Sequence, residues 1–424
     1  MTRVAAAAPP ALVAYRLASA ALAPIAPLWL AVRARRGRED RVRLDERLGL
    51  ASAARPPGPL VWLHAASVGE SLALLPLADH LAGRVPPTNI LFTSGTVTSA
   101  KLIAGRLPPG AVHQYAPLDT PSFARAFIDH WRPRLAILVE SELWPNLILA
   151  ARDGGARTAL ISANLSDASA RRWARAPRSF ATLLGAFDLV LARDEASARR
   201  LASLGARVDG LADLKYGAPP LPVDESALAW WRERTASRTV LVAASTHPGE
   251  EDIVLEAFAG VARHASRPLL ILVPRHPDRG AVVAGLAAKR GLATRRRSLR
   301  GDVDSAEVLV GDTLGEMGLW YRLAHLAVIG GSFVPGVGGH NPFEPARLGR
   351  PFVAGPHTDR WPVYQELQRL GGARLVEGDL AELFLAAANS SSFAGMADRA
   401  RRYVAAGDQD VAGAFDRVMD LIDR

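Results

Sequence analysis

Residues Gly330–Ala346 read GGSFVPGVGGHNPFEPA and decide how the whole chain is interpreted. An apolar run, Leu326–Ile329, precedes this stretch, and a helix-compatible segment begins at Phe343. Its five glycines allow positive φ angles and a close approach of the backbone to a ligand. A strand, a glycine loop and a helix N-terminus together favour an anion, because free amides and the helix dipole both attract a phosphate. The stretch therefore predicts a phosphate-binding loop.

The polar residues that follow the glycines allow two interpretations. Asn341 suits the N-cap of the next helix, and Pro342 suits its first position. Glu344 would repel a phosphate, but it could bind ribose hydroxyls. The alternative is that Asn341 and Glu344 form a capping box with no ligand role. The preceding glycines favour the ligand loop.

Bulk composition limits the possible classes of protein. A chain of 424 residues predicts two domains, and 49% hydrophobic residues suffice for two cores. The absence of cysteine excludes disulfides and thiolate metal sites. The formal charge of +9 suits an anionic membrane, a polyanionic substrate or nucleic acid. No zinc finger, RNA-binding aromatic signature or basic zipper is present, so we expect no nucleic-acid partner.

The N-terminal segment resembles a membrane-surface anchor. Residues 4–32 are rich in Ala, Leu and Pro, but Arg16 and four prolines argue against a clean spanning helix. Arginines follow at once, and each cation contributes about 1 kcal/mol near anionic lipid. The alternative is a helix packed on the core, followed by a solvated charged linker. The arginines are Arg33, Arg35, Arg36, Arg38, Arg41, Arg43 and Arg47.

Two series of short apolar runs alternate with helical stretches and predict two parallel, doubly wound α/β sheets. The expected strands of the first series are Leu60–Leu63, Asn89–Phe92, Leu135–Val139, Thr158–Ile161 and Leu189–Leu191. Those of the second are Thr239–Ala243, Leu269–Val273, Val308–Val310, Leu326–Ile329 and Pro351–Val353. We therefore expect a membrane-associating segment at 1–47, a first domain at 48–217, a linker at 218–236 and a second domain with a terminal helix at 237–424.

Ligands of open α/β sheets bind beyond the carboxyl ends of the strands. Four successive loops of the second half carry suitable groups: Ser245–Glu250, Pro274–Pro277, Gly311–Glu316 and the glycine stretch. Arg275 offers a fork for a phosphate or a carboxylate. A Walker A loop and a two-metal carboxylate cluster are absent, and the histidines lack metal-ligand spacing. These loops predict a nucleotide site without a bound metal.

Acidic residues follow two strands of the first half. Glu70 lies at a helix start, on the side expected to face the cleft between the domains, where it could take a proton from a sugar hydroxyl. It could equally be a helix-start glutamate favoured by the dipole. Glu140 and Glu142 precede Trp144 and Pro145. They could hold an acceptor, or they could belong to a capped helix start with a core tryptophan.

Six blocks in this order, HAASVGE, LVESELWPN, STHPGEE, PRHPDR, DTLGEMG and GGHNPFEPA, resemble the 3-deoxy-D-manno-octulosonic acid (Kdo) transferases of lipopolysaccharide assembly. The resemblance covers nearly the whole chain, including the N-terminal apolar and Arg-rich segment. It implies a GT-B fold, in which two Rossmann-like domains face each other across a cleft. It also implies a CMP-Kdo donor, a lipid A precursor (lipid IVA) as acceptor, and inversion without a metal or another cofactor.

The resemblance also implies roles for single residues. The family's catalytic base is the Glu of its SVGE motif, which is Glu70 here. The family's motifs place the CMP of the donor at Arg275, His276, Gly315, Glu316, Gly339, Asn341 and Glu344, and we expect the acceptor at Ser67, Gly69, Glu140 and Glu142.

Several positions depart from the family pattern. The family's Asn-Ala-Arg-Leu-Ser block and its second arginine correspond to Ser162–Ala168, which carries neither arginine. The family's Gly-Asn-Leu-Lys is Ala212–Lys215, and Thr358–Trp361 replaces a usual Asn-Phe pair. These changes bear on the acceptor and the number of sugars added more than on the nucleotide.

Three functions follow from these observations. The first is a Kdo transferase at the cytoplasmic face of the inner membrane of a Gram-negative cell, which the whole set of motifs favours. The second is a divergent GT-B transferase that uses another CMP-ulosonate or another acceptor, which the missing arginines allow. The third is an inactive scaffold in envelope assembly, which the intact Glu70 and glycine stretch disfavour. The sequence predicts no particular oligomeric state.

Overall fold

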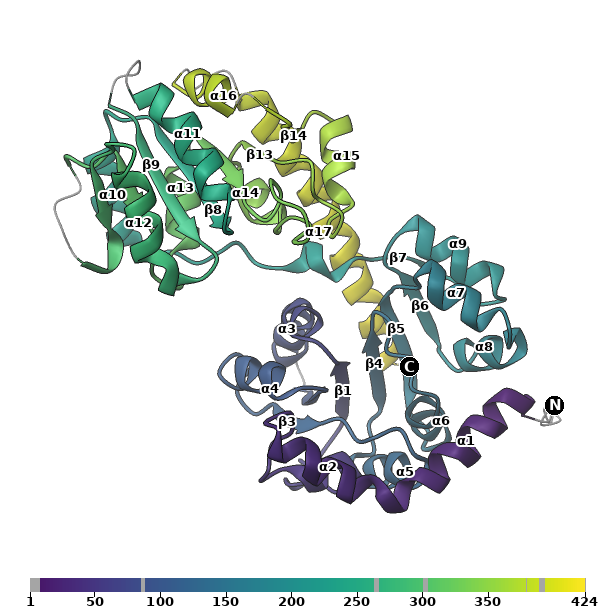
Figure 1. The fold of residues 1–424 in the computed structure, drawn as a ribbon. Coiled ribbons are helices and arrows are strands. Elements are labelled where there is room, and N and C mark those ends of the chain that lie inside the picture. Colours follow the sequence, from purple (N-terminus) through teal and green to yellow (C-terminus); the bar gives the residue numbers. More distant parts are fainter. Residues whose placement is uncertain are drawn as a thin grey trace. The chain divides into compact units, whose positions relative to one another are not determined.

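The computed structural model describes residues 8–84, 88–262, 267–299, 304–378, 380–388 and 393–423. The chain forms two compact units, one of Met1–Ala218 with Gly407–Arg424 and the other of Pro219–Ala406. Each unit contains a parallel sheet of seven strands flanked by helices, shown in Figure 1. The predicted pair of doubly wound sheets is therefore confirmed.

The first unit has the strand order β3-β2-β1-β4-β5-β6-β7. Helices α5, α6 and α8 cover one face of its sheet, while α3, α4 and the end of α17 cover the other. Its strands are β1 (Leu60–Ala65), β2 (Asn89–Ser94), β3 (Val112–Tyr115), β4 (Leu135–Val139), β5 (Arg157–Ala163), β6 (Leu189–Ala192) and β7 (Gly210–Leu211). Its helices are α1 (Pro10–Leu22), α2 (Ala26–Arg35), α3 (Val68–Ala82), α4 (Val97–Ala104), α5 (Pro121–Trp131), α6 (Pro145–Asp153), α7 (Asp167–Trp173), α8 (Pro177–Leu184) and α9 (Glu195–Ser203).

The second unit repeats this plan, with the strand order β10-β11-β9-β8-β12-β13-β14. Its strands are β8 (Val240–Thr246), β9 (Leu269–Pro274), β10 (Thr294–Arg296), β11 (Val308–Val310), β12 (Leu326–Ile329), β13 (Phe352–Ala354) and β14 (Arg374–Leu375). Its helices are α10 (Glu225–Thr235), α11 (Glu250–Ala262), α12 (Gly280–Ala288), α13 (Met317–Leu323), α14 (Phe343–Arg347), α15 (Val363–Arg369) and α16 (Leu380–Ala386), followed by α17 (Ala394–Asp423).

The structure of two segments, residues 218–236 and the end of the chain, differs from the sequence-based prediction. The expected linker 218–236 contains helix α10, whose Trp231 is buried and packs edge-on against Trp320, with ring centroids 5.1 Å apart. The end of the chain, expected with the second domain, belongs to the first unit. The reason is that α17 carries an apolar stripe, including Val411, Phe415 and Val418, which is buried against the first sheet.

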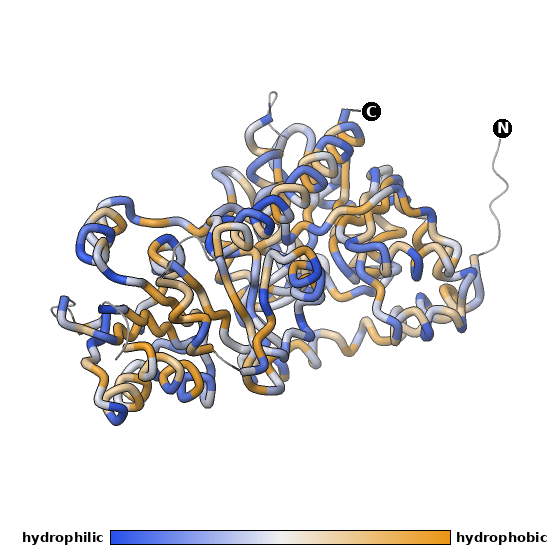
Figure 2. Tube along the Cα trace, turned by 90° about the horizontal axis from the view of Figure 1, so that it is seen from above, coloured by the Kyte–Doolittle hydropathy of each residue, from blue (hydrophilic) through white to orange (hydrophobic). Residues whose placement is uncertain are grey.

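The N-terminal helices pack on the first unit and remain largely exposed. The Tyr15 hydroxyl donates to Oδ2 of Asp119 at 2.8 Å, and the Asn146 amide donates to Oγ of Ser19 at 3.1 Å. Apolar residues are nevertheless spread along α1 and α2 (Figure 2). By length and composition alone, the helical stretch Pro10–Arg35 could cross a membrane.

The arginines that follow this segment divide into two groups. Arg33 and Arg47 pair with the buried carboxylate of Glu39, so the segment is not a fully solvated linker. Arg43 pairs with buried Glu46, with Nε and Oε1 2.8 Å apart. In contrast, Arg35, Arg36 and Arg38 are exposed, and no ion pair is found for them among the described residues.

Glu46 attaches the Arg-rich segment to the first sheet, which allows a test of its contribution to stability. Its carboxylate accepts from the Tyr115 amide at 2.7 Å and also binds Arg43 and Ser52. We expect Glu46→Ala to lower the free energy of unfolding by roughly 1–3 kcal/mol, because the Tyr115 amide loses its buried acceptor and half-buried Arg43 loses its ion pair. Asp45→Ala, at the exposed neighbouring position, should change it by less than about 0.5 kcal/mol. Urea titrations compare the two variants, and equal stabilities would contradict this role.

Candidate active site

The strand order of the first unit brings two loops together. The order reverses at the β1–β4 pair, and the loops that leave such a pair diverge and open a crevice at the carboxyl edge of the sheet. The loop after β1 carries Ser67, Gly69 and Glu70, and the loop after β4 carries Glu140 and Glu142. These are the base and the acceptor residues that the sequence predicted.

Glu70 lies in the first turn of α3 and forms a capping box with Ser67. Its amide donates to Oγ of Ser67, and its Oε2 accepts from the amides of Ala66 at 2.8 Å and Ser67 at 3.2 Å. The helix-start interpretation of Glu70 is thus correct, but it does not exclude the catalytic one. The described hydrogen bonds of this carboxylate use Oε2, and they fix the direction in which Oε1 points.

Glu140 is held in an unusual backbone conformation at the end of β4. Its φ is 57°, a left-handed value that costs a non-glycine residue about 1–3 kcal/mol and is often found at functional sites. Its Oε2 lies 3.6 Å from Nη1 of Arg193. Burial raises the pKa of Glu140 above its usual value, and the charges of Arg193 and Lys215 oppose that rise. The result is a mostly buried acid beside two cations.

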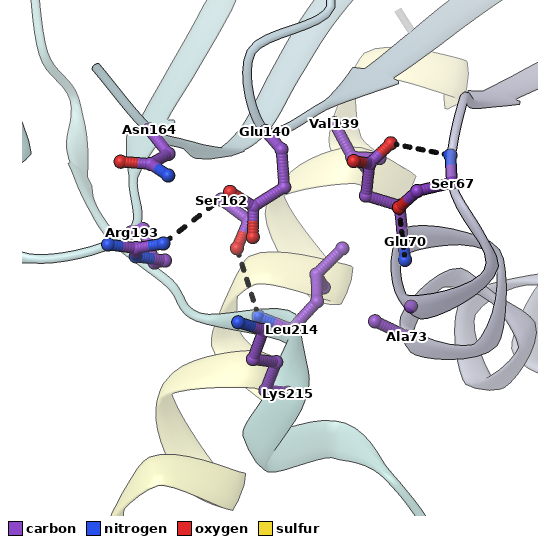
Figure 3. Close-up of a pocket in the computed structure, with 11 residues that line it drawn as sticks. Ser67, Glu70, Ala73, Val139, Glu140, Ser162, Asn164, Arg193, Leu214 and Lys215 are labelled. Carbon is purple, nitrogen blue, oxygen red and sulfur yellow. Dashed lines mark hydrogen bonds and ion pairs between the residues drawn. The ribbon is translucent and has the colours of Figure 1, made fainter. Parts of the chain in front are cut away.

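These loops surround a cavity of about 260 Å³, shown in Figure 3. Glu70 and Ser67 lie on one side of it, and Glu140, Arg193 and Lys215 lie on the other. The space beside Gly69 is open, since a Cβ there would meet no atom within 4 Å. Ser67, Gly69, Glu70 and Glu140 therefore line one polar cavity that contains both carboxylates and cations.

Glu142 is directed elsewhere. Its Oε2 lies 3.4 Å from Nε2 of buried His64 and accepts the indole N–H of Trp144. Burial alone would raise the pKa of Glu142, but the hydrogen bonds of His64 and Trp144 hold it below its usual value. Trp144 is 42% exposed and is not the core tryptophan that the alternative interpretation required.

In the second unit, one buried carboxylate holds the glycine stretch in place. The strand order reverses at the β8–β12 pair, and Glu250 lies just after β8. Its two oxygens accept from the amides of Gly331, Ser332 and Phe333 at 2.7–2.9 Å, and from the amide of His247 at 2.9 Å. The negative charge of Glu250 thus draws the loops after β8 and β12 together.

Beside the glycine stretch lies a group of imidazoles and guanidinium groups. The rings of His247 and His340 stack with centroids 5.1 Å apart, and their Nε2 atoms are 2.9 Å apart. The His276 ring lies 6.4 Å from that of His247. Burial, followed by the charges of His247, Arg275 and Arg360, lowers the pKa of His340 to about 4. This local positive potential suits an anion.

Glu344 is half-buried near Arg275 and Asn341. Burial raises the pKa of Glu344 to about 7, against the opposing effects of the Arg275 charge and a hydrogen bond with the Asn341 side chain. Helix α14 begins one residue later than expected, and Asn341 Oδ1 accepts from the Phe343 amide at 3.0 Å. The N-cap position is Pro342 and not Asn341, and in the described part of the chain Asn341 Oδ1 binds the Phe343 amide instead of the Glu344 amide that the predicted capping box requires.

The remaining predicted nucleotide residues divide between two places. Gly339 has a φ of 82°, and its amide donates to the Gly331 carbonyl at 2.7 Å within the glycine stretch. Gly315 and Glu316 lie at the start of α13, where Glu316 binds Arg297, with Nη2 and Oε1 2.7 Å apart, and also binds Thr313. Among the described residues, no hydrogen bond or ion pair joins Gly315 or Glu316 to Arg275 or Glu344.

Several polar residues at these loops were not predicted. Arg193 follows β6, and its place in the cavity depends on sheet topology that no local motif reveals. Lys215 follows β7 and belongs to the block Ala212–Lys215, which the motif comparison contained without assigning it a role. Glu250 and His340 lie inside the STHPGEE and GGHNPFEPA blocks, so the motifs contained them without assigning them a role. Within the described ranges, no group of three or more His, Asp or Glu side chains is placed to hold a metal ion.

The fold resembles solved structures. The UDP-GlcNAc 2-epimerase from Neisseria meningitidis, bound to UDP-GlcNAc, superposes with a TM-score of 0.54 at 13% identity. The match covers 82% of this chain and 99% of that protein. The glycosyltransferase from Rickettsia africae gives a TM-score of 0.51 at 14% identity, over 87% of this chain and 96% of that one. These likenesses show the fold, which is of the expected GT-B type.

Comparison of sequences gives the family. Residues 42–218 match the family described as 3-Deoxy-D-manno-octulosonic-acid transferase (kdotransferase). The 3-deoxy-D-manno-octulosonic acid transferase of Bordetella pertussis is 36% identical, over 81% of this chain and 83% of that protein. The transferase of the same name from Haemophilus influenzae is 35% identical, over 78% of this chain and 79% of that protein. The chain therefore belongs to the family of 3-deoxy-D-manno-octulosonic acid transferases.

Proposed function

We propose that the protein transfers Kdo from CMP-Kdo to a lipid A precursor of the lipid IVA type in lipopolysaccharide core assembly. The observation that carries this proposal is the cavity of the first unit, where the oriented carboxylate of Glu70 shares a polar space with Arg193 and Lys215. A sugar acceptor needs a base beside its hydroxyl, and a phosphorylated acceptor needs cations. Family membership supports the transferred sugar.

In this proposal, Glu70 is the general base of an inverting transfer. The acceptor hydroxyl oxygen forms a bond to the anomeric carbon of Kdo, and the bond between that carbon and the phosphate oxygen breaks. CMP leaves with the electron pair of that bond, and the hydroxyl proton passes to the Glu70 carboxylate. The two backbone amides that bind Oε2 orient the carboxylate before the acceptor arrives. The proposal needs no cofactor besides the donor.

The donor site of the proposal lies in the second unit. Arg275 supplies the positive charge for the phosphate of CMP, and His247 and His340, whose pKa values burial lowers, offer neutral ring nitrogens for hydrogen bonds. Glu344 is placed to accept hydrogen bonds from ribose hydroxyls, and Glu250 fixes the glycine loop that approaches the nucleotide. Gly315 and Glu316 remain donor residues in this proposal, with Glu316 oriented by Arg297.

The acceptor site is where this chain departs from the family pattern. Asn164 occupies the block that commonly carries arginine, yet a guanidinium still lies in the cavity because Arg193 supplies it. Ser67, Gly69 and Glu140 would contact the acceptor, whereas Glu142 would support the loop from behind. A transferase for another acceptor is the second candidate, and the position of Asn164 is the observation that favours it.

Glu70→Gln tests the base directly. Glutamine at this position keeps the capping box, because its amide oxygen can still accept from the two backbone amides. It cannot take a proton, so we expect kcat to fall by roughly 10²–10⁴-fold while CMP binding and the melting temperature stay near the wild-type values. Near-full turnover with both substrates saturating would show that another residue is the base.

The nucleotide assignment can be tested by heat protection. We expect CMP at about 100 times its dissociation constant to stabilise the protein by about 2.7 kcal/mol, since it binds only the folded state. Arg275→Ala should remove most of this protection, and Arg290→Ala, which breaks a surface ion pair, should leave it intact. Protection by UDP but not by CMP would overturn the proposed donor.

We also propose that the N-terminal segment holds the protein on the cytoplasmic face of the inner membrane. The exposed apolar residues of α1 and α2 and the exposed arginines Arg35, Arg36 and Arg38 support this proposal.

Charge removal tests the membrane contact without disturbing the fold. Each cation contributes about 1 kcal/mol near anionic lipid, so replacing Arg35, Arg36 and Arg38 with Ala should weaken binding to anionic vesicles by about 100-fold. The matched change at Arg399, Arg401 and Arg402, on exposed positions of α17, should have little effect. Vesicle sedimentation measures both variants, and equal binding would place the membrane contact elsewhere.

A further inference from the structure

A second cavity of the first unit differs in character from the polar one. It measures about 460 Å³, within the usual range of about 300–1,000 Å³ for ligand pockets. One wall is the N-terminal arm, defined here as α1, the short helical turn Ala23–Ile25 and α2. The arm contributes Tyr15, Leu22 and Trp29, and the body of the unit contributes Leu118 and Trp144. We call this cavity the arm groove.

The polar groups of the arm groove are already satisfied within the protein. Those groups are the side chains of Tyr15, Ser19, Asp119, Thr120 and Trp144. The Asp119 carboxylate accepts from the Tyr15 hydroxyl and from the amides that begin α6. The other three bind Asn146, the Phe123 amide and Glu142. A polar ligand would therefore find few open partners, and the groove offers mainly hydrocarbon contact.

The surroundings of the groove indicate an amphiphilic ligand. Leu22 is 58% exposed and Trp29 is 49% exposed, so the apolar lining reaches the surface. The arm ends at Arg35, and the exposed cations Arg36 and Arg38 follow it. The groove is apolar, and exposed cations follow the arm that forms its wall. This combination is complementary to a molecule that joins a hydrocarbon chain to an anionic group.

One loop connects the arm groove with the cavity beside Glu70, which we call the reaction cavity. The loop between β4 and α6 carries Glu140, which lines the reaction cavity, and Trp144, which lines the groove. Trp144 lies four positions after Glu140, a span of at most about 14 Å even in an extended chain. Between them, Glu142 contacts both the Trp144 indole and His64 of β1. One lipid molecule is long enough to reach both places.

We propose that the arm groove binds an acyl chain of the acceptor lipid itself, while the sugar of that lipid occupies the cavity beside Glu70. This inference rests on the proposed function and adds a specificity site to it. Trp144 lies between the arm groove and the reaction cavity. Its ring lines the groove that would hold the acyl chain, and its N–H donates to the carboxylate of Glu142. The groove thus makes acylation of the acceptor part of what the enzyme recognises.

Filling the groove tests this inference by kinetics. Ala18 lines the groove and is exposed, so Ala18→Trp should block it without opening the core. Ala20 is exposed on the same helix but does not line the groove, so Ala20→Trp is the matched control. The acceptor is a tetraacylated disaccharide phosphate in detergent. We expect Ala18→Trp to raise KM for this acceptor about tenfold, which is the loss expected when two methylene groups of the acyl chain are no longer buried, and to leave kcat unchanged.

The fully deacylated disaccharide distinguishes groove binding from damage to the fold. On this acceptor, wild-type protein, Ala18→Trp and Ala20→Trp should have the same kcat/KM. An equal KM for both variants on the acylated acceptor would overturn the inference. A similar loss on both acceptors would also overturn it, since that result would indicate damage to the reaction cavity.

Photolabelling tests the groove independently of turnover. A tetraacylated acceptor with a diazirine on one acyl chain should label peptides that contain residues of the arm or Trp144, and Ala18→Trp should reduce this labelling. Equal labelling by a phosphatidylglycerol with the same diazirine chain would identify bulk lipid as the occupant and overturn the inference. Specific labelling by the acceptor, without transfer from CMP-Kdo, would support the lipid site and refute the proposed reaction.

Discussion

The reversal of strand order at the centre of each sheet is the constraint on which both sites depend. In the first unit the loops after β1 and β4 border the point of reversal, and in the second the loops after β8 and β12 do. Parallel strands deliver their carboxyl ends to one edge, and the reversal opens space between two of these loops. Glu70 and Glu140 are far apart in sequence, but they line the same cavity because they follow the two strands, β1 and β4, that border the point of reversal.

At both reversal points, a carboxylate that binds backbone amides fixes the loop geometry. Glu70 accepts from two amides at the start of α3, and Glu250 accepts from four amides of two loops. In Glu250 both oxygens are used, so its function is structural and it shapes the glycine stretch. In Glu70 the described bonds use one oxygen, which leaves the other for chemistry. The base role that we propose for Glu70 depends on this free oxygen, which Glu250 lacks.

The strands and the motifs were predictable from the sequence because both are local signals. All ten expected strands are present, since buried parallel strands are short, continuous apolar runs. The missed strands β3, β7, β10 and β14 are the edge strands of the two sheets. They are short or polar, such as β7 with two residues and β10 with its two arginines. Edge strands are often charged, which protects them from pairing with other chains but removes the apolar signal.

Long-range pairing was not predictable. The sequence shows a run of arginines after residue 32, but it does not show that Glu39 and Glu46 bind some of them while others remain exposed. It likewise gives no sign that Arg193 enters the cavity beside Glu140. The Arg193–Glu140 pair forms between elements that only the folded sheet brings together. The Arg33–Glu39 and Arg43–Glu46 pairs are close in sequence, but the burial of both carboxylates depends on the folded unit, as the bond from the Tyr115 amide to Glu46 shows. The apolar composition of the N-terminal arm could be predicted from the sequence. The groove between the arm and Trp144 could not, because it forms between segments that are far apart in the sequence.

The central claim is that this chain moves Kdo from CMP-Kdo to an acylated, phosphorylated sugar acceptor. Mass spectrometry of the lipid after incubation with CMP-Kdo and a tetraacylated lipid A precursor tests this claim most directly. We expect the mass of the acceptor to rise by one or more Kdo residues, with an equal amount of CMP released. An unchanged acceptor mass, in a preparation whose stability CMP increases, would contradict the claim.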